Sequence, residues 1–161
     1  MRSPSELYAR ARSAFAAHQE AVSRAMIPVL AAAGADGVTV IRQLWRQETA
    51  PSVRRWVVEA AGVHNGRWVR PLIRQALTDP AMTVRLHALL VIDRRRDRSL
   101  AAEAMPLAND DSGGIRTNCL AVLADLKPDG WRVVMERGLQ DPKAYVRAQC
   151  RKILANDPPR T

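Results

Sequence analysis

Aromatic residues, cysteine and histidine are scarce in this 161-residue sequence, and each scarcity excludes a class of protein. Aromatic residues make up 4% of the chain, and its two cysteines, Cys119 and Cys150, provide neither a disulfide framework nor a zinc-binding spacing. The three histidines, His18, His64 and His87, lack the spacing of a metal site. No apolar run reaches the roughly 18 residues that a membrane-spanning helix needs, and the charged N-terminal stretch predicts no secretory signal. We therefore expect a cytoplasmic protein that uses no metal, cofactor or membrane.

Lysine is scarce as well. It accounts for three of the 25 basic residues, which leaves 22 arginines, and the formal net charge is +9. A surplus of positive charge favours an acidic partner, such as nucleic acid, an anionic surface or an acidic protein. The arginine bias is also typical of a genome-composition effect, in which arginine fills solvated positions. The remaining composition, 47% hydrophobic and rich in alanine and leucine, favours one helical domain with a buried core.

Four segments repeat one pattern at intervals of 31 residues. They begin at Arg46, Leu77, Ala108 and Leu139. Each has an acid in its third position and, six residues later, an arginine that follows a β-branched residue. The acids are Glu48, Asp79, Asp110 and Asp141, and the arginines are Arg54, Arg85, Arg116 and Arg147. Agreement in three columns over four copies without gaps indicates an internal repeat.

The apolar residues of each copy predict one helix, helix B, because they recur at the β-branched residue and four, seven and eight residues after it. In the first copy these residues are Val53, Val57, Ala60 and Ala61. A second helical pattern, helix A, precedes each copy. One column of helix A contains Val38, Val69, Leu100 and Trp131. Turn sequences such as "HNG" at 64–66 separate the copies, so each unit consists of helix A, a turn, helix B and a turn.

The first 33 residues fit the same register but lack the acid and the arginine, as expected of a cap at the end of a repeat array. Their core positions in helix B are Val22, Met26, Val29 and Leu30. Ser3 and Glu6 predict a capping box at the first helix. We predict an all-α fold, a right-handed α-solenoid of about five antiparallel helix pairs in one domain. The predicted units are the cap, 1–33, and the repeats 34–65, 66–96, 97–127 and 128–161.

The Asp-Pro turns at 79–80 and 141–142, followed by Val-Arg at 84–85 and 146–147, resemble those of HEAT repeats of the short bacterial type, which form armadillo-like superhelices. In that family the turn acid and the helix B arginine form a ladder between neighbouring units. The resemblance implies that each acid caps helix B and pairs with an arginine of an adjacent unit. It also implies that the concave face, lined by helix B, binds another protein.

Some HEAT-repeat proteins are enzymes, and their requirements can be compared with this sequence. Deoxyhypusine hydroxylase-like proteins use His-Glu pairs as iron ligands, whereas the histidines here are followed by Gln19, Asn65 and Ala88. HEAT-like alkylpurine DNA glycosylases use a cationic concave groove with aromatic residues and a catalytic aspartate. This chain shares the basic charge, but its candidate acids are mostly those of the predicted ladder.

The column three residues after each β-branched residue points away from the core columns, and we predict that it forms a partner-binding ridge on the concave face. The ridge contains Trp56, His87, Asn118 and Gln149, with Arg55, Arg151 and Lys152 beside it. An exposed tryptophan would be the aromatic anchor of an interaction hot spot. The alternative is that Trp56 packs on the cap and the remainder is ordinary surface.

A second candidate site is the turn "DRRRDR" at 93–98, whose cations could contact phosphate or simply offset a helix dipole. Its candidate anion-binding residues are Arg94, Arg95, Arg96 and Arg98. Helix A carries further basic residues, which would favour an anionic ligand if they gather on one face. They are Arg42, Arg46, Arg70, Arg74, Arg132 and Arg137.

No arrangement of catalytic residues is recognisable in this register. We therefore predict a non-catalytic protein-binding module, an adaptor, regulatory subunit or toxin-neutralising partner, that recognises an acidic protein surface. The alternative is a nucleic-acid-binding protein that uses arginine-rich surfaces and is related to the DNA glycosylases.

Overall fold

The computed structural model describes residues 3–157, which form ten α-helices, one 3₁₀ helix and no strand. The prediction of an all-α fold is confirmed for these residues, and the first two and last four residues of the predicted domain lie outside them. The chain separates into two compact units, unit 1 ending at Val91 and unit 2 beginning at Ile92. No described helix combines the length and the hydrophobicity needed to cross a membrane.

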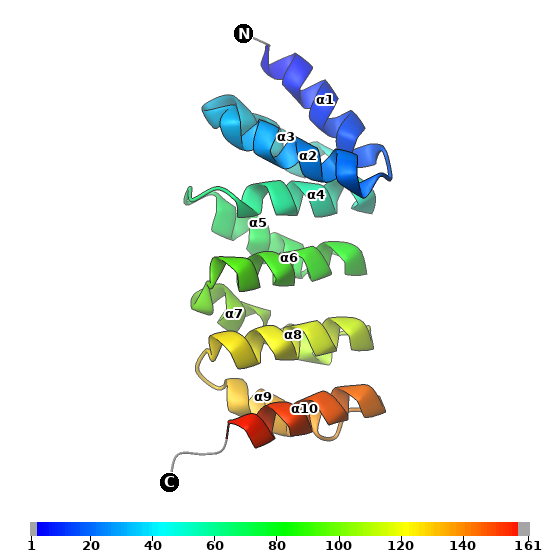
Figure 1. Ribbon diagram of the computed structural model, residues 1–161, viewed down its shortest axis with the longest axis vertical. Helices are drawn as coiled ribbons and strands as arrows, with labels where there is room; N and C mark the ends of the chain where they lie inside the picture. Colours follow the sequence, from blue (N-terminus) through cyan, green and yellow to red (C-terminus); the bar gives the residue numbers. More distant parts are fainter. Residues whose placement is uncertain (1–2, 158–161) are drawn as a thin grey trace. The chain divides into compact units, whose positions relative to one another are not determined.

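Unit 1 is built from consecutive helices that pack against one another (Figure 1). They are α1 (Pro4–Ala16), α2 (Glu20–Ala32), α3 (Gly34–Gln47), α4 (Pro51–Gly62), α5 (Val69–Leu77) and most of α6 (Met82–Arg95). α2 contacts α3 and α4, and α4 also contacts α1, α3 and α5. The first helix begins with the predicted capping box: Glu6 N donates to Ser3 Oγ at 3.3 Å, and Ser3 N donates to Glu6 Oε2 at 3.2 Å.

Unit 2 contains the end of α6, four further α-helices and one 3₁₀ helix. They are α7 (Arg98–Ala104), the 3₁₀ helix η1 (Met105–Asn109), α8 (Gly113–Leu126), α9 (Trp131–Gly138) and α10 (Ala144–Asn156). α8 contacts α7, η1, α9 and α10, so it is the central helix of this unit. The four predicted boundaries between repeat units, after residues 33, 65, 96 and 127, all fall between helices.

The first two predicted core columns of the repeated B helices, α4, α6, α8 and α10, are buried. The β-branched residues Val53, Val84, Ile115 and Val146 are each at most 2% exposed. The residues four positions later are Val57, Ala88, Cys119 and Cys150, and all are fully buried. Both cysteines are free thiols, Cys119 in α8 and Cys150 in α10. Burial raises the pKa of the Cys119 thiol to about 12, which keeps it protonated at neutral pH.

Two of the four predicted core residues of helix B in the cap are buried, and two are exposed. Met26 and Leu30 are buried, but Val22 is 41% exposed and Val29 37% exposed. Both valines border an open cleft between α1 and α2 that is also lined by Ala9. The prediction that they lie in the core is therefore wrong, because no helix covers this face of the cap within the described residues.

The acid and the arginine of the repeated pattern form ion pairs between neighbouring copies. In unit 1, Arg54 Nε donates to Asp79 Oδ2 at 2.8 Å. In unit 2, Arg116 donates from Nε to Asp141 Oδ2 at 2.6 Å and from Nη2 to Asp141 Oδ1 at 2.9 Å. The predicted pairing is confirmed for these two pairs. The two-pronged geometry at Arg116 is the strong form of a guanidinium–carboxylate contact.

The acids do not cap helix B directly, which corrects the second part of that prediction. Asp79 Oδ1 accepts from Ala81 N and Asp141 Oδ1 accepts from Lys143 N, and each donor is the residue just before its helix. The helix is instead joined to the turn by its arginine. Arg147 Nη1, for example, donates to the backbone oxygen of Asp141 at 2.6 Å. Acid and arginine together therefore fix the turn between helices A and B.

The cap supplies an arginine for this ladder from a position outside the repeat register. Arg12 of α1 donates from Nε to Glu48 Oε1, and Tyr8 Oη lies 3.4 Å from the same oxygen. The repeat column has Ser23 at this place, and the Ser23 hydroxyl donates to the backbone oxygen of Ala14. The cap thus binds the acid of the first repeat through α1.

We expect Arg116→Ala to lower the free energy of unfolding of unit 2 by about 1–3 kcal/mol, because it leaves the buried Asp141 carboxylate without its guanidinium. The hydrogen bond from Arg116 lowers the pKa of Asp141. The stability gained from Asp141 is therefore present at neutral pH and is lost as the pH falls below about 4. Urea unfolding followed by circular dichroism at pH 7 measures the loss.

The control is Arg98→Ala, which removes an exposed ion pair with Asp129. Exposed pairs contribute about 0–1 kcal/mol, so this variant should unfold close to the wild type. Equal losses in the two variants would show that the ladder pair adds nothing beyond a surface contact.

Candidate protein-binding groove

Trp56, the predicted anchor of the ridge, is not on the surface. It is 2% exposed, and Arg24 of α2 lies over its ring, with Cζ 5.9 Å from the ring centroid. Arg55 lies over the same ring at 4.9 Å, and the His87 ring meets it edge-on at 5.8 Å. The prediction of an exposed hot spot at Trp56 and Arg55 is therefore wrong, because α2 of the cap packs on α4 and covers this position.

The other ridge residues are bound to the protein itself. His87 Nδ1 lies 2.7 Å from Glu59 Oε1 of α4, and Gln149 Nε2 donates to the backbone oxygen of Thr117 in α8 at 3.1 Å. Asn118 Nδ2 donates to the backbone oxygen of Gly114, one turn earlier in its own helix. His87 and Gln149 thus face the preceding helix B, and the predicted open row of side chains does not form at Trp56 or His87.

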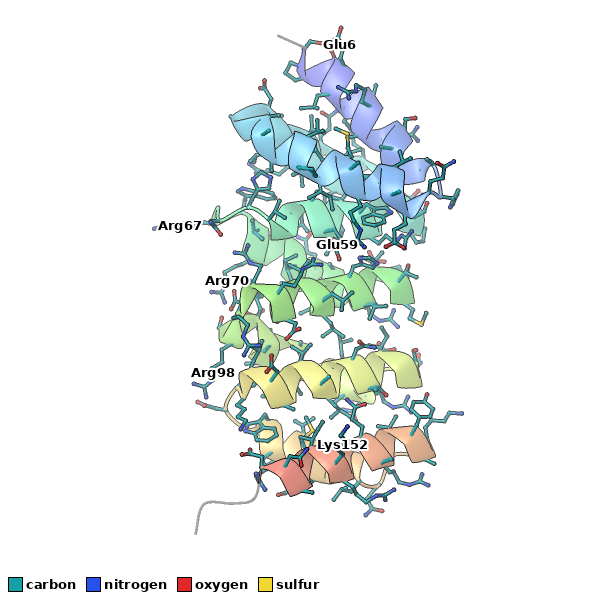
Figure 2. The ribbon with its side chains drawn as sticks, in the orientation of Figure 1. Glu6, Glu59, Arg67, Arg70, Arg98 and Lys152 are labelled. Carbon is teal, nitrogen blue, oxygen red and sulfur yellow. The ribbon has the colours of Figure 1, made fainter. Side chains whose placement is uncertain are left out.

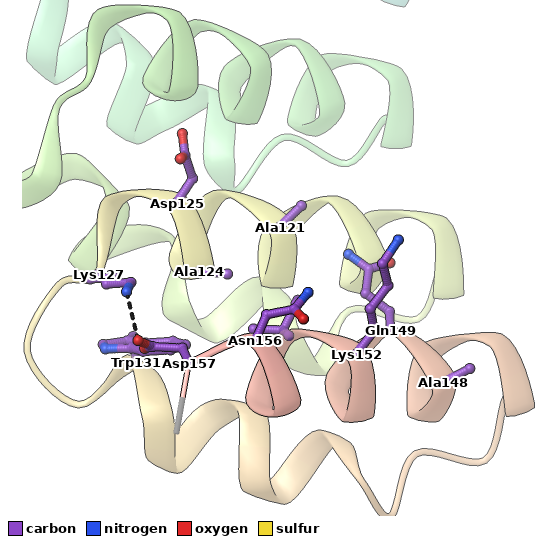
Figure 3. Close-up of a pocket in the computed structure, with 11 residues that line it drawn as sticks. Ala121, Ala124, Asp125, Lys127, Trp131, Ala148, Gln149, Lys152, Asn156 and Asp157 are labelled. Carbon is purple, nitrogen blue, oxygen red and sulfur yellow. Dashed lines mark ion pairs between the residues drawn. The ribbon is translucent and has the colours of Figure 1, made fainter. Parts of the chain in front are cut away.

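The column three residues further along helix B holds the buried Glu59 in α4 but is the more open one from α6 onward. Leu90 is 38% exposed, and Ala121 and Lys152 are also exposed. In unit 2 this column lines an open groove of about 650 Å³ between α8 and α10 (Figure 3). Its apolar lining comes from both helices and from the first residue of α9. The apolar lining residues are Ala121, Ala124, Ala148, Ile153 and Trp131.

Trp131 closes one end of the groove. Its ring lies 5.5 Å from Lys127 Nζ, a cation–π distance. Lys127 Nζ also lies 3.1 Å from Asp157 Oδ1 (Figure 3). The sequence placed Trp131 in a helix A core column, but it is only half-buried. The sequence signal for this partial exposure is the preceding turn, "KPDG" at 127–130, which makes Trp131 the first residue of a helix.

The long side of the groove carries two of the predicted site residues, Gln149 and Lys152 of α10 (Figure 3). Lys152 is exposed and forms no ion pair with any residue between 3 and 157. The carboxylate of Asp125, by contrast, is bound by Arg96. The predicted Arg151 lies next to Lys152 in α10 and is exposed, but it does not line the groove.

The arginine-rich turn at 93–98 is not an open cluster of cations. Arg96 pairs with Asp125, and Arg98 donates from Nη2 to Asp129 Oδ1 at 2.7 Å and from Nε to the backbone oxygen of Lys127 at 2.9 Å. Arg94 and Arg95 also interact with other residues of the protein. Arg96 and Arg98 thus form exposed ion pairs with neighbouring carboxylates, and the anion-binding role of the four arginines stays a prediction.

Within residues 3–157, no group of three or more His, Cys, Asp or Glu side chains is placed to hold a metal ion. The histidines lie apart: His64 packs against Trp68 with ring centroids 5.5 Å apart, and His87 contacts Glu59 and Trp56. The sequence matches no protein-family model and no curated protein.

Proposed function

We propose that the protein is a non-catalytic, cytoplasmic protein-binding module built as a HEAT-like solenoid of five helix pairs with a 31-residue period. In this role it would serve as an adaptor, a regulatory subunit or an inhibitor of a toxin. The observation that carries the proposal is the groove between α8 and α10, in which an apolar lining ends at a half-buried tryptophan. The buried apolar columns and the ladder pairs support the solenoid.

The ligand that fits this groove best is an amphipathic helix of a partner protein. The alanines at 121, 124 and 148 let another backbone approach α8 and α10 closely, as required for a helix bound in a groove. Trp131 offers a large apolar surface, of the type that forms interaction hot spots. The apolar face of the bound helix would therefore lie on the alanines and on Trp131.

Charge indicates that the polar face of this helix is acidic. Lys152 has no carboxylate partner within the described residues, and Arg151 beside it is exposed. The two rim acids are bound within the protein, Asp125 by Arg96 and Asp157 by Lys127. Lys152 is therefore an uncompensated cation of the groove lining, which favours carboxylates on the partner and speeds their association. The net charge of +9 acts in the same direction.

Ala148→Arg tests the proposal because it fills the groove without touching the core. Ala148 is exposed and lines the groove, whereas Ala155 is exposed on the same helix outside it. Ala155→Arg adds the same charge and volume and is the matched control. We expect Ala148→Arg to weaken partner binding about 30-fold, the effect of losing one hot spot. Quantitative affinity capture from cells that contain the protein, followed by titration of the purified partner, measures the effect.

The proposal predicts a partner that binds the wild type and Ala155→Arg but not Ala148→Arg. Lys152→Glu should weaken the binding of this partner by a larger factor at low salt than at high salt, because salt screens the attraction between a rim charge and the partner. A partner that binds Ala148→Arg as tightly as Ala155→Arg would place the interface elsewhere.

A further inference from the structure

Unit 1 contains a second concave feature, a cleft of about 250 Å³ between α3 and α5. The cleft is lined by α3, by α5 and by Trp68, the residue before α5. None of its lining residues borders the groove between α8 and α10. Arginine and tryptophan side chains dominate its lining. The lining residues are Arg42, Trp45, Arg46, Trp68, Pro71, Leu72 and Gln75.

The cleft is strongly basic. Arg42 and Arg46 are exposed one helical turn apart, and neither is paired with a carboxylate of residues 3–157. Arg46 Nε donates to the backbone oxygen of Arg42 at 3.2 Å, which holds it along α3. α5 contains no acidic residue. Its Arg70 and Arg74 do not line the cleft, and both interact with other residues of the protein. Figure 2 shows Arg67 and Arg70 on the same edge of unit 1.

The two acids at the ends of α3 do not pair with these arginines. Asp36 is in the first turn of α3, six residues and so roughly 9 Å before Arg42 along the helix, and roughly 15 Å before Arg46. Glu48 follows α3 directly, but its carboxylate is already bound by Arg12 of α1. The cleft therefore keeps an excess of two guanidinium groups in its lining.

The two tryptophans of the cleft are held in fixed orientations. Trp45 Nε1 donates to Gln75 Oε1 at 2.7 Å, which joins α3 to α5 along the cleft. The Trp68 indole lies on the backbone of Gly66, where an added Cβ would be 2.4 Å from Trp68 Nε1. Trp68 is only half-buried. The indole is therefore held by Gly66 at its Nε1 edge and by the His64 ring, whose centroid lies 5.5 Å away, while it still borders the cleft.

We propose that this cleft binds single-stranded nucleic acid, with phosphates on Arg42 and Arg46 and a base stacked on Trp68. Guanidinium groups bind phosphate through paired N–H donors. Unpaired bases stack on fixed aromatic rings beside a basic surface, the combination that proteins use to bind single strands. A duplex offers only its phosphates, because its base faces are already stacked. A peptide made of acidic residues alone would use the arginines but would have no aromatic group to stack on Trp68.

Fluorescence anisotropy with a short labelled oligothymidylate tests the arginines. Wild-type affinity should fall steeply as salt rises, because each phosphate contact on a single strand contributes about 0.7 to the slope of log K against log salt. The double variant Arg42→Ala, Arg46→Ala should bind more weakly and lose about 1.4 from this slope. The matched control is Arg10→Ala, Lys143→Ala, which removes the same charge from two exposed positions outside the cleft. It should keep the wild-type slope.

Trp68→Ala tests the stacking. It should weaken binding by about five-fold or more while leaving the salt slope unchanged, and Trp68→Phe should restore part of the loss. Circular dichroism checks that each variant is folded. If Trp68→Ala does not fold, the double variant Arg42→Ala, Arg46→Ala still tests the site. Equal affinity for a duplex of the same length would overturn the assignment to single strands. So would an oligoglutamate peptide that binds with the same dependence on Arg42 and Arg46, or the absence of oligonucleotide binding at low salt.

Discussion

Gly37→Ala is expected to destabilise unit 1 by about 3 kcal/mol, although an alanine inside a helix normally stabilises it. Gly37 lies in α3, and a Cβ at this residue would be 1.9 Å from the backbone oxygen of Leu30 in α2. A side chain could rotate away from such a contact, but a backbone carbonyl in a helix cannot. The two helices must therefore separate, and the packing around the buried Leu30 is lost with them.

Gly114→Ala is the matched control for this change. Gly114 lies in the first turn of α8, and the nearest atom to an added Cβ is Ser112 Oγ at 3.6 Å, an ordinary contact. Its substitution should leave stability unchanged or raise it by up to about 1 kcal/mol. Thermal unfolding followed by circular dichroism should place the midpoint of Gly37→Ala about 12 °C or more below the wild type. A wild-type midpoint for Gly37→Ala would show that α2 and α3 do not approach this closely.

The helix B core could be predicted from the sequence because burial follows the helical period. Val53, Ile115 and Val146 recur with apolar residues one and two turns later, and this pattern determines which face of each helix is buried. Predicted core positions of helix B are partly exposed only at the ends of the array. Val29 in the cap and Ile153 in the last helix are partly exposed, because a terminal helix lacks a neighbour on one side.

The candidate site was harder to predict because a helical period does not reveal which neighbour covers the remaining faces of a helix. Within each unit the ridge lies at the contact between two B helices, where His87 meets Glu59 and Gln149 reaches back to Thr117. Moving three residues along the helix leads to the open column at Ala121 and Lys152. This choice depends on how closely the B helices approach one another, a distance that sequence spacing does not contain.

The partners of the charged residues were missed for a related reason. Arg12 reaches Glu48 across 36 residues from a helix outside the repeat register. Arg96 reaches Asp125 across 29 residues from a turn that resembled a free basic cluster. The ladder pairs were predictable because the same residues recur in every copy. Ion pairs that occur once leave no repeated pattern in the sequence, so only the three-dimensional structure reveals them.

Trp56→Ala is expected to lower the free energy of unfolding of unit 1 by about 3–5 kcal/mol, the usual loss when a buried tryptophan is truncated. Trp56 is 2% exposed and packs under Arg24 of α2. Its removal leaves a cavity beneath the cap. It also opens a path for water to the contact between Glu59 and His87, whose ring touches the indole.

Leu90→Ala in α6 is the control for this variant, since Leu90 is a large apolar residue of unit 1 that is 38% exposed. Its truncation should cost under about 1 kcal/mol, because much of the side chain is already in water. Trp56→Phe should recover a large part of the loss by filling most of the cavity. Urea unfolding of the three variants separates burial from binding without any partner present. If Trp56→Ala unfolds at the wild-type midpoint, the indole is on the surface after all, and the ridge residues again become candidates for partner contact.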